Sequence, residues 1–157
     1  MKDLKQYPQI KECKADELSG GDRAVVDLAI AATACSYAPY SHFRVGACVL
    51  LEGGETVTGC NQENAAFPAG ICAERCAIFA AGARYPGKAV KTLAIAARGK
   101  DGELTDEPVA PCGTCRQVMA ETEKRFSQPI HILLYGRRRI YMMDGISNLM
   151  PLTFTEF

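Results

Sequence analysis

The chain has 157 residues, and its 18 Lys and Arg balance its 18 Asp and Glu, so the formal net charge is zero. A nucleic-acid-binding surface normally shows as a basic excess, so this balance argues against nucleic acid as a partner. Residues 1–157, with a hydrophobic fraction of 48%, are expected to form a single globular domain with a sizeable core.

The cysteine count bears on the cellular compartment. Eight cysteines would suggest disulfides in a secreted protein. The first residues, Met1–Lys5, contain no apolar signal core, and no run of the chain reaches the length of a membrane span. We therefore expect a cytoplasmic protein with reduced thiols and no membrane partner.

The chain opens with a charged segment followed by a helix. Residues 1–17 lack clear periodicity, which leaves open whether they form an N-terminal arm that lies on the domain. A helix is expected to start near Ser19–Asp22, where either end residue suits an N-cap. Pro39 is expected to end this region. Apolar residues between these points recur at helical spacing and predict a stripe that faces the core: Val25, Leu28, Ala29 and Ala32.

The rest of the chain predicts alternating strands and helices. Strands are expected over residues 43–52, 55–61, 91–98, 130–136 and 138–144, with a hairpin turn at 53–54 between the first two. Helices are expected over residues 71–83, between the second and third strands, and 111–128, between the third and fourth. This order predicts an α/β fold of three layers, in which a five-stranded mixed sheet has helices on both faces. The one basic run, Arg137–Arg139, is expected to be a solvated turn or strand start.

A charged side chain stands in the apolar helix expected over residues 71–83. From Ile71 to Ala83 the charged residues are Glu74 and Arg75. A helix that is apolar nearly all round is a buried one, and a buried Glu without a partner is costly. Arg75 is poorly placed as that partner, because adjacent side chains on a helix point apart. Glu74 therefore indicates a functional site, the alternative being a first-turn acid that complements the helix dipole.

Cysteines near this helix predict a metal site. Cys112-x-x-Cys115 has the spacing at which two thiolates in one helical turn bind one metal ion, although a redox pair has the same spacing. Cys72 is expected in the first turn of its own helix, where a thiolate is favoured. Three thiolates fill three corners of a zinc tetrahedron and leave the fourth for water, as in a catalytic site. The alternative is a structural zinc clip with Cys76 as the fourth ligand.

Several motifs together resemble a known family. Cys72-Ala-Glu74 followed by Pro111-Cys-x-x-Cys115 resembles the signature of zinc-dependent nucleoside and nucleobase deaminases. Longer stretches are similar to the small homotetrameric cytidine deaminases, namely Tyr40-Ser-His-Phe43, Gly59-Cys-Asn-Gln-Glu-Asn-Ala65, Cys72-Ala-Glu-Arg75 and Pro111-Cys-Gly-Thr-Cys-Arg-Gln-Val118. The resemblance runs from about Ala24 to Phe154. It implies the same fold, one zinc ion per chain, and conversion of cytidine or 2′-deoxycytidine to the uracil nucleoside and ammonia in pyrimidine salvage.

The resemblance also implies roles for single residues. It makes Glu74 the catalytic proton carrier beside a zinc ion bound by Cys72, Cys112 and Cys115. It implies that Asn61 and Glu63 bind the ribose hydroxyls, that Phe43 packs against the pyrimidine, that the Ala73 N–H binds the pyrimidine O2, and that the Ala110 carbonyl accepts from the 4-amino group. Without the surrounding motifs, Asn61 and Glu63 would be ordinary loop residues and Phe43 a residue of the strand core.

Charge balance suggests helpers for the metal site. Three thiolates and Zn²⁺ sum to a negative charge, which would weaken zinc as a Lewis acid. We expect Arg75, together with Gln117, to hydrogen-bond the sulfurs and withdraw charge from them. Arg116 has a weaker case, since an ion pair at the surface or at an interface would equally explain it.

The C-terminal stretch Leu149-Met-Pro-Leu-Thr-Phe154 resembles a family ending whose Phe reaches a neighbouring subunit's active site. Phe154 is therefore the expected contact, and Phe67 stands where the family often has an interface Tyr. Arg44 stands where the family usually has Pro, which alters the entrance to the site and not its chemistry. The competing interpretations are another small-molecule deaminase of the same fold, such as the blasticidin type, a polynucleotide deaminase, or a non-catalytic zinc-stabilised binding protein.

Overall fold

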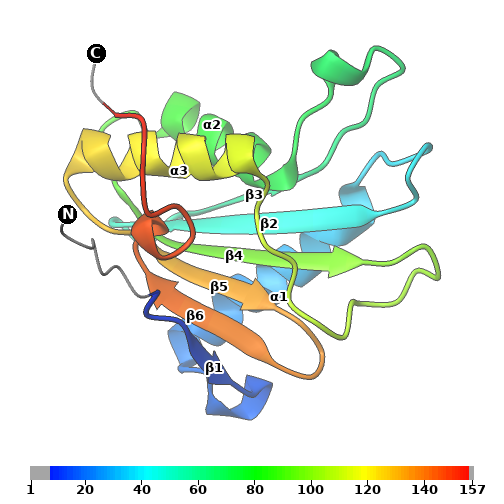
Figure 1. Ribbon diagram of the computed structural model, residues 1–157, viewed down its shortest axis with the longest axis horizontal. Helices are drawn as coiled ribbons and strands as arrows, with labels where there is room; N and C mark the ends of the chain where they lie inside the picture. Colours follow the sequence, from blue (N-terminus) through cyan, green and yellow to red (C-terminus); the bar gives the residue numbers. More distant parts are fainter. Residues whose placement is uncertain (1–7, 156–157) are drawn as a thin grey trace, which may run out of the picture.

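A mixed β-sheet forms the centre of the computed structural model, which describes residues 8–155 (Figure 1). The sheet has six strands in the order β1-β6-β5-β4-β2-β3. The strands are β1 (Lys11–Cys13), β2 (Arg44–Leu51), β3 (Thr56–Cys60), β4 (Val90–Arg98), β5 (His131–Tyr135) and β6 (Ile140–Asp144). β4 and β5 pair in parallel, and the other neighbours pair antiparallel. The mixed α/β class is as expected.

The prediction of five strands is wrong, because β1 adds a sixth at the sheet edge. Its three residues pair with β6, with Lys11 opposite Met142 and Cys13 opposite Ile140. An ion pair of 3.2 Å also joins Glu12 of β1 to Arg139, the residue just before β6. A strand of three residues that begins Lys-Glu carries too little alternation of apolar and polar residues to be read from sequence. Residues 1–7 of the expected N-terminal arm lie outside the described residues.

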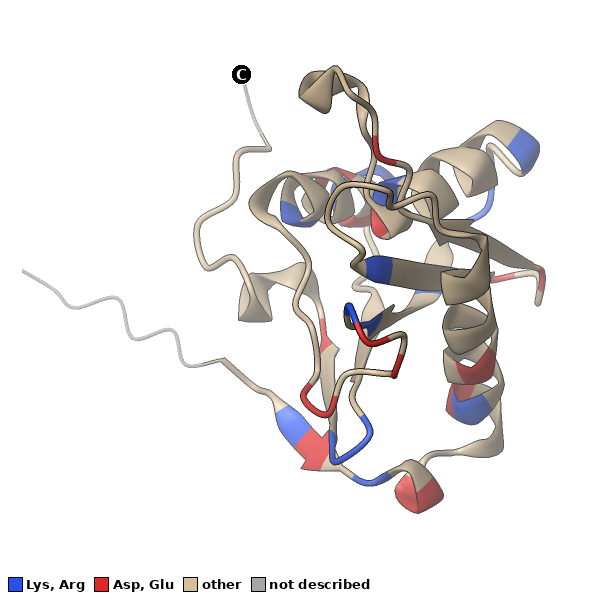
Figure 2. Cartoon of the chain, turned by 90° about the vertical axis from the view of Figure 1, so that its right-hand side faces the viewer, with Lys and Arg blue, Asp and Glu red and all other residues tan. Residues whose placement is uncertain are grey.

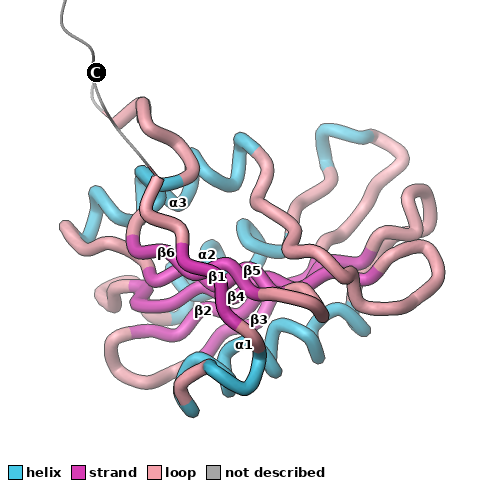
Figure 3. The backbone as a smooth tube through the Cα atoms, turned by 60° about the horizontal axis from the view of Figure 1, so that its bottom comes forward, coloured by secondary structure: helices cyan, strands magenta, loops and turns pink. Residues whose placement is uncertain are grey.

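Helix α1 (Gly20–Ala32) covers one face of the sheet (Figure 3). Ser19 is its N-cap and accepts a hydrogen bond of 3.1 Å from the backbone N–H of Asp22, which confirms one of the two expected caps. Val25, Val26 and Ala29 of this helix pack on small residues that β2 and β4 present to the same face, including Cys48. The helix ends at Ala32 and a short 3₁₀ turn follows, earlier than Pro39.

Helices α2 (Ala73–Arg84) and α3 (Gly113–Phe126) cover the opposite face (Figure 3). β2 alternates between the two faces, so Ala47, Val49 and Leu51 join this larger core while Cys48 faces α1. β4 is buried on both faces, as expected. Gly59 lets β3 approach α2 closely, because a Cβ there would lie 2.4 Å from the Ala77 backbone nitrogen. The first turn of α2 is therefore held close to the sheet.

Charged residues of both signs are interspersed along the chain (Figure 2). Arg137 and Arg138 pair with Asp106 at 2.7 and 3.3 Å, and Arg139 pairs with Glu12 and Glu107. Through these ion pairs, residues Arg137–Arg139 connect the loop before α3 to strand β1 at the edge of the sheet. Within residues 8–155, no helix combines the length and apolarity that a bilayer span requires, and the eight cysteines are all unpaired.

Candidate metal centre

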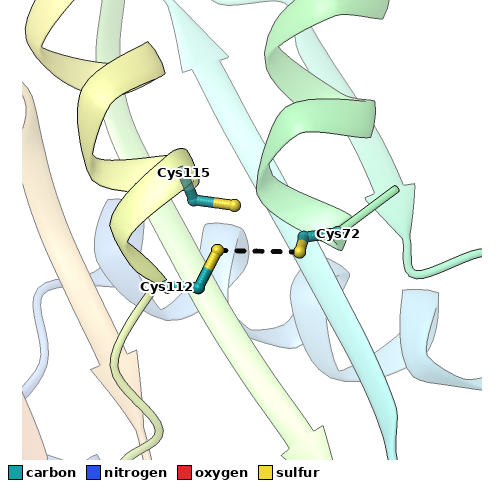
Figure 4. Close-up of side chains that lie close together, drawn as sticks. All are labelled: Cys72, Cys112 and Cys115. Atoms are coloured by element: carbon teal, nitrogen blue, oxygen red, sulfur yellow. Dashed lines mark hydrogen bonds between the residues drawn. The ribbon is translucent and has the colours of Figure 1, made fainter. Parts of the chain in front are cut away.

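The sulfurs of three cysteines converge between the N-termini of α2 and α3 (Figure 4). Cys72 is the N-cap of α2 and Cys112 is the N-cap of α3, whereas Cys115 lies fully buried in the first turn of α3. Their three Sγ atoms lie within 4.8 Å of one another, and those of Cys72 and Cys112 are 3.8 Å apart. The structure thus brings together the three residues that the sequence singled out as metal ligands.

The geometry and chemistry of this cluster fit a zinc ion. Zn–S bonds of about 2.3 Å in a tetrahedron place sulfurs about 3.8 Å apart, which matches the separation of Cys72 and Cys112. Both helix N-termini favour negative charge on the sulfurs. Cys76, the alternative fourth ligand, is partly buried and is not among the converging sulfurs. Three protein ligands leave a fourth position, as in catalytic rather than closed structural sites.

The protein favours a thiolate at Cys72. A hydrogen bond from Cys115, with a further one from the Arg75 guanidinium, lowers the pKa of the Cys72 thiol to about 5. The same hydrogen bond and burial raise the pKa of the Cys115 thiol. One sulfur is therefore charged and the other holds its proton. A metal ion would displace that proton, because metal ligation requires thiolates.

Glu74 is buried next to these sulfurs. Its relative exposure is 4%, and it lies in the first turn of α2, directly after Ala73. Burial raises the pKa of the Glu74 carboxyl, and the charge on Cys72 adds to the rise. A carboxyl with a raised pKa exchanges protons more readily near neutral pH than an ordinary one. This location is unlike that of a solvated acid at a helix start.

Glu63 is held by the backbone of the loop before β2. One of its carboxylate oxygens accepts hydrogen bonds from the Tyr40 and Ser41 backbone N–H groups at 2.9 and 3.2 Å, and the other accepts from the Ser41 hydroxyl. The Ser41 hydrogen bond is the main cause that lowers the pKa of the Glu63 carboxyl. The carboxylate is thus charged and fixed in direction. Ser41 holds it, a role that sequence patterns alone do not indicate.

Asn61 joins the end of β3 to the start of β2. Its side-chain oxygen accepts from the Val45 N–H at 2.8 Å, and its side-chain nitrogen donates to the Phe43 carbonyl at 2.9 Å. Both ends of the amide therefore hold the backbone beside Phe43, whose own side chain is partly buried. Each end retains capacity for one further hydrogen bond.

The two backbone groups expected at the substrate flank the metal cluster. Ala73 is buried and is the first residue of α2, where the first N–H groups of a helix have no partner within the helix. Ala110 is exposed and lies two residues before Cys112. Their roles toward a substrate stay predictions.

Arg75 and Gln117, the expected partners of the sulfurs, have different contacts. Arg75 Nη2 lies 3.6 Å from Cys72 Sγ, in line with the expectation for Arg75. The Gln117 amide donates instead to the Phe154 carbonyl at 2.6 Å. Arg116 has no carboxylate partner within residues 8–155, and its guanidinium donates to two backbone carbonyls, those of Pro111 and Leu149.

Phe67 and Phe154, the expected contacts with a neighbouring subunit, both project from the surface. Phe67 is 91% exposed at the start of the short 3₁₀ turn Phe67–Ala69 before α2, and Phe154 is 67% exposed in the C-terminal tail (residues 149–155). Exposure of this size is uncommon for a Phe side chain, and the contacts expected with a neighbouring subunit stay predictions.

Comparison with known proteins adds independent information. Residues 20–127 match the cytidine and deoxycytidylate deaminase zinc-binding region. The chain is 45% identical over 93 residues to a cytidine deaminase of Halalkalibacterium halodurans, a match that covers 59% of this chain and 65% of that protein. It is 47% identical over 86 residues to a cytidine deaminase of Sporosarcina psychrophila, covering 55% and 58%. The matched segment thus spans less than two thirds of the length of these relatives.

The fold is also similar to solved structures. The crystal structure of cytidine deaminase from Burkholderia pseudomallei matches with a TM-score of 0.71 and 35% identity over 83% of this chain and 97% of that chain. Cytidine deaminase from Mycobacterium tuberculosis matches with a TM-score of 0.64 and 30% identity over 85% and 96%.

Proposed function

This chain belongs to the cytidine and deoxycytidylate deaminase family, as the match over residues 20–127 shows, and from that premise we propose that it is a zinc-dependent cytidine deaminase. The proposed reaction is hydrolytic deamination of cytidine, and of 2′-deoxycytidine, to the uracil nucleoside and ammonia. The observation that carries the proposal is the buried carboxyl of Glu74 beside three converging cysteine sulfurs. A zinc site that only stabilised the fold would have no need of such a carboxyl.

Cys72, Cys112 and Cys115 would hold the metal. When bound, zinc supplies Lewis acidity that makes water a nucleophile at neutral pH. Arg75 donates toward Cys72 and offsets part of the charge of the thiolates.

Glu74 is the proposed proton carrier. It takes the proton of the attacking water and delivers it to N3 of the pyrimidine, while the oxygen of the water adds to C4. Glu74 then takes the proton of the new C4 hydroxyl and passes it to the amino group, which leaves as ammonia as the C4 carbonyl forms. One carboxyl can perform both transfers if donor and acceptors lie on the same side of the ring. The raised pKa of the Glu74 carboxyl suits a group that must both accept and release a proton.

The remaining residues are proposed to bind and orient the nucleoside. Glu63 and Asn61 would bind the ribose hydroxyls, and their contacts with the loop before β2 would fix the direction of these groups. Phe43 would pack against the pyrimidine, the Ala73 N–H would bind O2, and the Ala110 carbonyl would accept from the 4-amino group. These roles follow from the family resemblance of the matching positions.

We further propose a homotetramer that acts in pyrimidine salvage in the cytoplasm. The exposure of Phe67 and Phe154 supports an assembly in which a neighbouring chain covers them. In that assembly Phe154 would reach the substrate of another subunit. Light scattering on the zinc-loaded protein would measure the mass, and a monomer would contradict the assembly.

Ammonia release tests the proposed reaction. Zinc-loaded protein is given cytidine or 2′-deoxycytidine, beside a Glu74→Ala variant whose zinc content equals that of the parent. The parent should release ammonia, and the variant should be slower by about 10²–10⁴-fold. A parent that holds one zinc per chain and leaves both nucleosides unchanged would contradict the proposed substrate. Other aminated heterocycles, beginning with blasticidin-type compounds, would then be assayed.

A further inference from the structure

Arg116 connects the metal site to the C-terminal tail. Its Nε donates to the Pro111 carbonyl at 2.9 Å, and its Nη1 donates to the Leu149 carbonyl at 2.7 Å. Pro111 directly precedes the proposed metal ligand Cys112. One guanidinium therefore connects the residue before this cysteine to Leu149, which lies 33 residues after Arg116 in the chain. Figure 1 shows this tail running across α3.

The Pro111 carbonyl has a particular need for this partner. Pro111 is buried and lies just outside α3, because Cys112 is the N-cap and its own carbonyl accepts the first intrahelical bond, from Arg116. A carbonyl at this position takes no part in the helix. If it is buried without a donor, its peptide unit tends to rotate toward one. Such a rotation would move Cys112, the next residue.

The other end of the bridge is firmly anchored. Leu149 packs against the main core, and its N–H donates to Ile146 at 2.8 Å. The Ile146 N–H in turn donates to Glu123 of α3 at 2.8 Å. The Leu149 carbonyl is therefore a fixed point against which Arg116 can hold Pro111.

The arrangement also suits arginine in particular. The guanidinium is a planar fork whose separate N–H groups can reach two acceptors in fixed directions. No carboxylate of residues 8–155 forms an ion pair with Arg116, so its two carbonyl contacts are what explain its conformation. A cation near the N-terminus of a helix is unfavourable with respect to the helix dipole, which also indicates a specific role.

We propose that Arg116 is a positioning residue that fixes the Cys112 turn against the C-terminal tail and thereby slows loss of the metal. The proposal rests on the zinc-dependent function proposed above. It predicts that loss of Arg116 speeds release of the metal and changes the arrangement of the thiolates around it. Arg116 itself does not contact the substrate.

Arg125 offers a matched control on the same helix. Its Nη2 donates to the carbonyl of another proline, Pro86, at 2.7 Å, at the opposite end of α3 from the cysteines. Arg116→Met and Arg125→Met therefore each remove one arginine of α3 that donates to a proline carbonyl. Arg116→Lys keeps the charge but not the planar fork, and it serves if Arg116→Met does not fold.

The experiment measures zinc release into excess chromophoric chelator at neutral pH. Loss of a group that orients a metal ligand typically weakens metal binding by about 10–100-fold, so Arg116→Met should release zinc about tenfold faster than the parent. Arg116→Lys should be intermediate, and Arg125→Met should match the parent. The thiolate-to-metal charge-transfer band of the cobalt-loaded protein should change in the Arg116 variants alone.

Each result decides a different point. A folded Arg116 variant that releases zinc at the parental rate, with the parental cobalt spectrum, would overturn the positioning role and leave the proposed deaminase untouched. Equal acceleration in Arg125→Met would overturn it too, since loss of any arginine of α3 would then suffice. A parent that binds no zinc would overturn both proposals.

Discussion

The Arg75 guanidinium lies 3.6 Å from the sulfur of Cys72 at the start of α2. Cys72 precedes Arg75 by three residues, so the two side chains are about one helical turn apart. Contact with a thiolate raises the pKa of Arg75, and the same contact helps lower the pKa of Cys72. The start of one helix thus carries the proposed metal ligand Cys72, the proposed proton carrier Glu74 and a cation, Arg75, that offsets the charge of the Cys72 thiolate.

Replacing Arg75 should separate catalysis from metal content. Arg75→Gln leaves more charge on the Cys72 sulfur, so a bound metal would be a weaker Lewis acid. We expect zinc content near that of the parent and a kcat lower by about 10–100-fold. The measurement is kcat for cytidine beside zinc content by atomic absorption, with Arg84→Gln of the same helix as the control. Unchanged zinc content together with unchanged turnover would exclude this role for Arg75.

Glycine at position 59 should be needed for the placement of α2. A Cβ at Gly59 would lie 2.4 Å from the Ala77 nitrogen and 2.6 Å from the Ala73 carbonyl oxygen, which are backbone atoms that cannot move aside separately. Gly59→Ala should lower the free energy of unfolding by about 1–3 kcal/mol, the usual cost of overpacking. It should also displace the first turn of α2, and with it Glu74.

A second glycine provides the control for this prediction. A Cβ at Gly82 of α2 would meet nothing within 4 Å, so Gly82→Ala should gain about 0.5–1 kcal/mol from helix propensity. Urea unfolding of both variants is the measurement. If Gly59→Ala proved as stable as Gly82→Ala, the close approach of β3 to α2 would not constrain the fold.

Much of the candidate site could be predicted because its residues lie in short motifs. Cys72 and Glu74 share the start of one helix, and Cys112 and Cys115 share the start of another, so local sequence carries the chemistry. The contacts that hold these turns are between distant parts of the chain. The acceptors of Arg116 and Gln117 are backbone carbonyls, which have no side-chain signature in a sequence.

The fold was predictable to a similar depth. Strands with apolar runs, such as β4, and the capped start of α1 were expected from pattern alone. β1 was missed because its stability comes from pairing with β6 and not from its own three residues. The hydrogen bond from the Ser41 hydroxyl to the Glu63 carboxylate forms because the loop before β2 lies close to the segment after β3. Sequence periodicity does not predict such a contact between distant residues.

Glu123 should make stability depend on pH. One of its carboxylate oxygens accepts from the Ile130 and Ile146 N–H groups at 2.9 and 2.8 Å, and burial raises the pKa of its carboxyl above 4.5. Because the folded pKa is raised, the folded state binds the proton more tightly than the unfolded state. The protonated Glu123 carboxyl therefore adds to the free energy of unfolding at a pH below its unfolded-state pKa. This contribution is lost as the pH rises through its folded-state pKa.

Two substitutions separate the charge of Glu123 from its hydrogen bonds. Glu123→Gln keeps the accepting oxygen and removes the charge, so its Tm should exceed that of the parent near neutral pH, with a difference that shrinks toward about pH 4.5. Glu123→Ala leaves two buried N–H groups without a partner and should cost about 1–3 kcal/mol. A Gln variant less stable than the parent at neutral pH would show that the charge is stabilising.

Zinc binding should release protons. The pKa of Cys72 is about 5, so this sulfur is already a thiolate at neutral pH, whereas the pKa of Cys115 is raised by its hydrogen bond with Cys72 and by burial. Zinc must displace at least the Cys115 proton, so apparent affinity should rise with pH, by about tenfold per pH unit for each proton displaced. Calorimetry of zinc binding to chelator-treated protein, in buffers of different ionisation enthalpy, counts these protons. Cys76→Ser alters a thiol outside the cluster, so it should leave the number of released protons unchanged. A binding heat that did not depend on the buffer would contradict a protonated Cys115 in the metal-free protein.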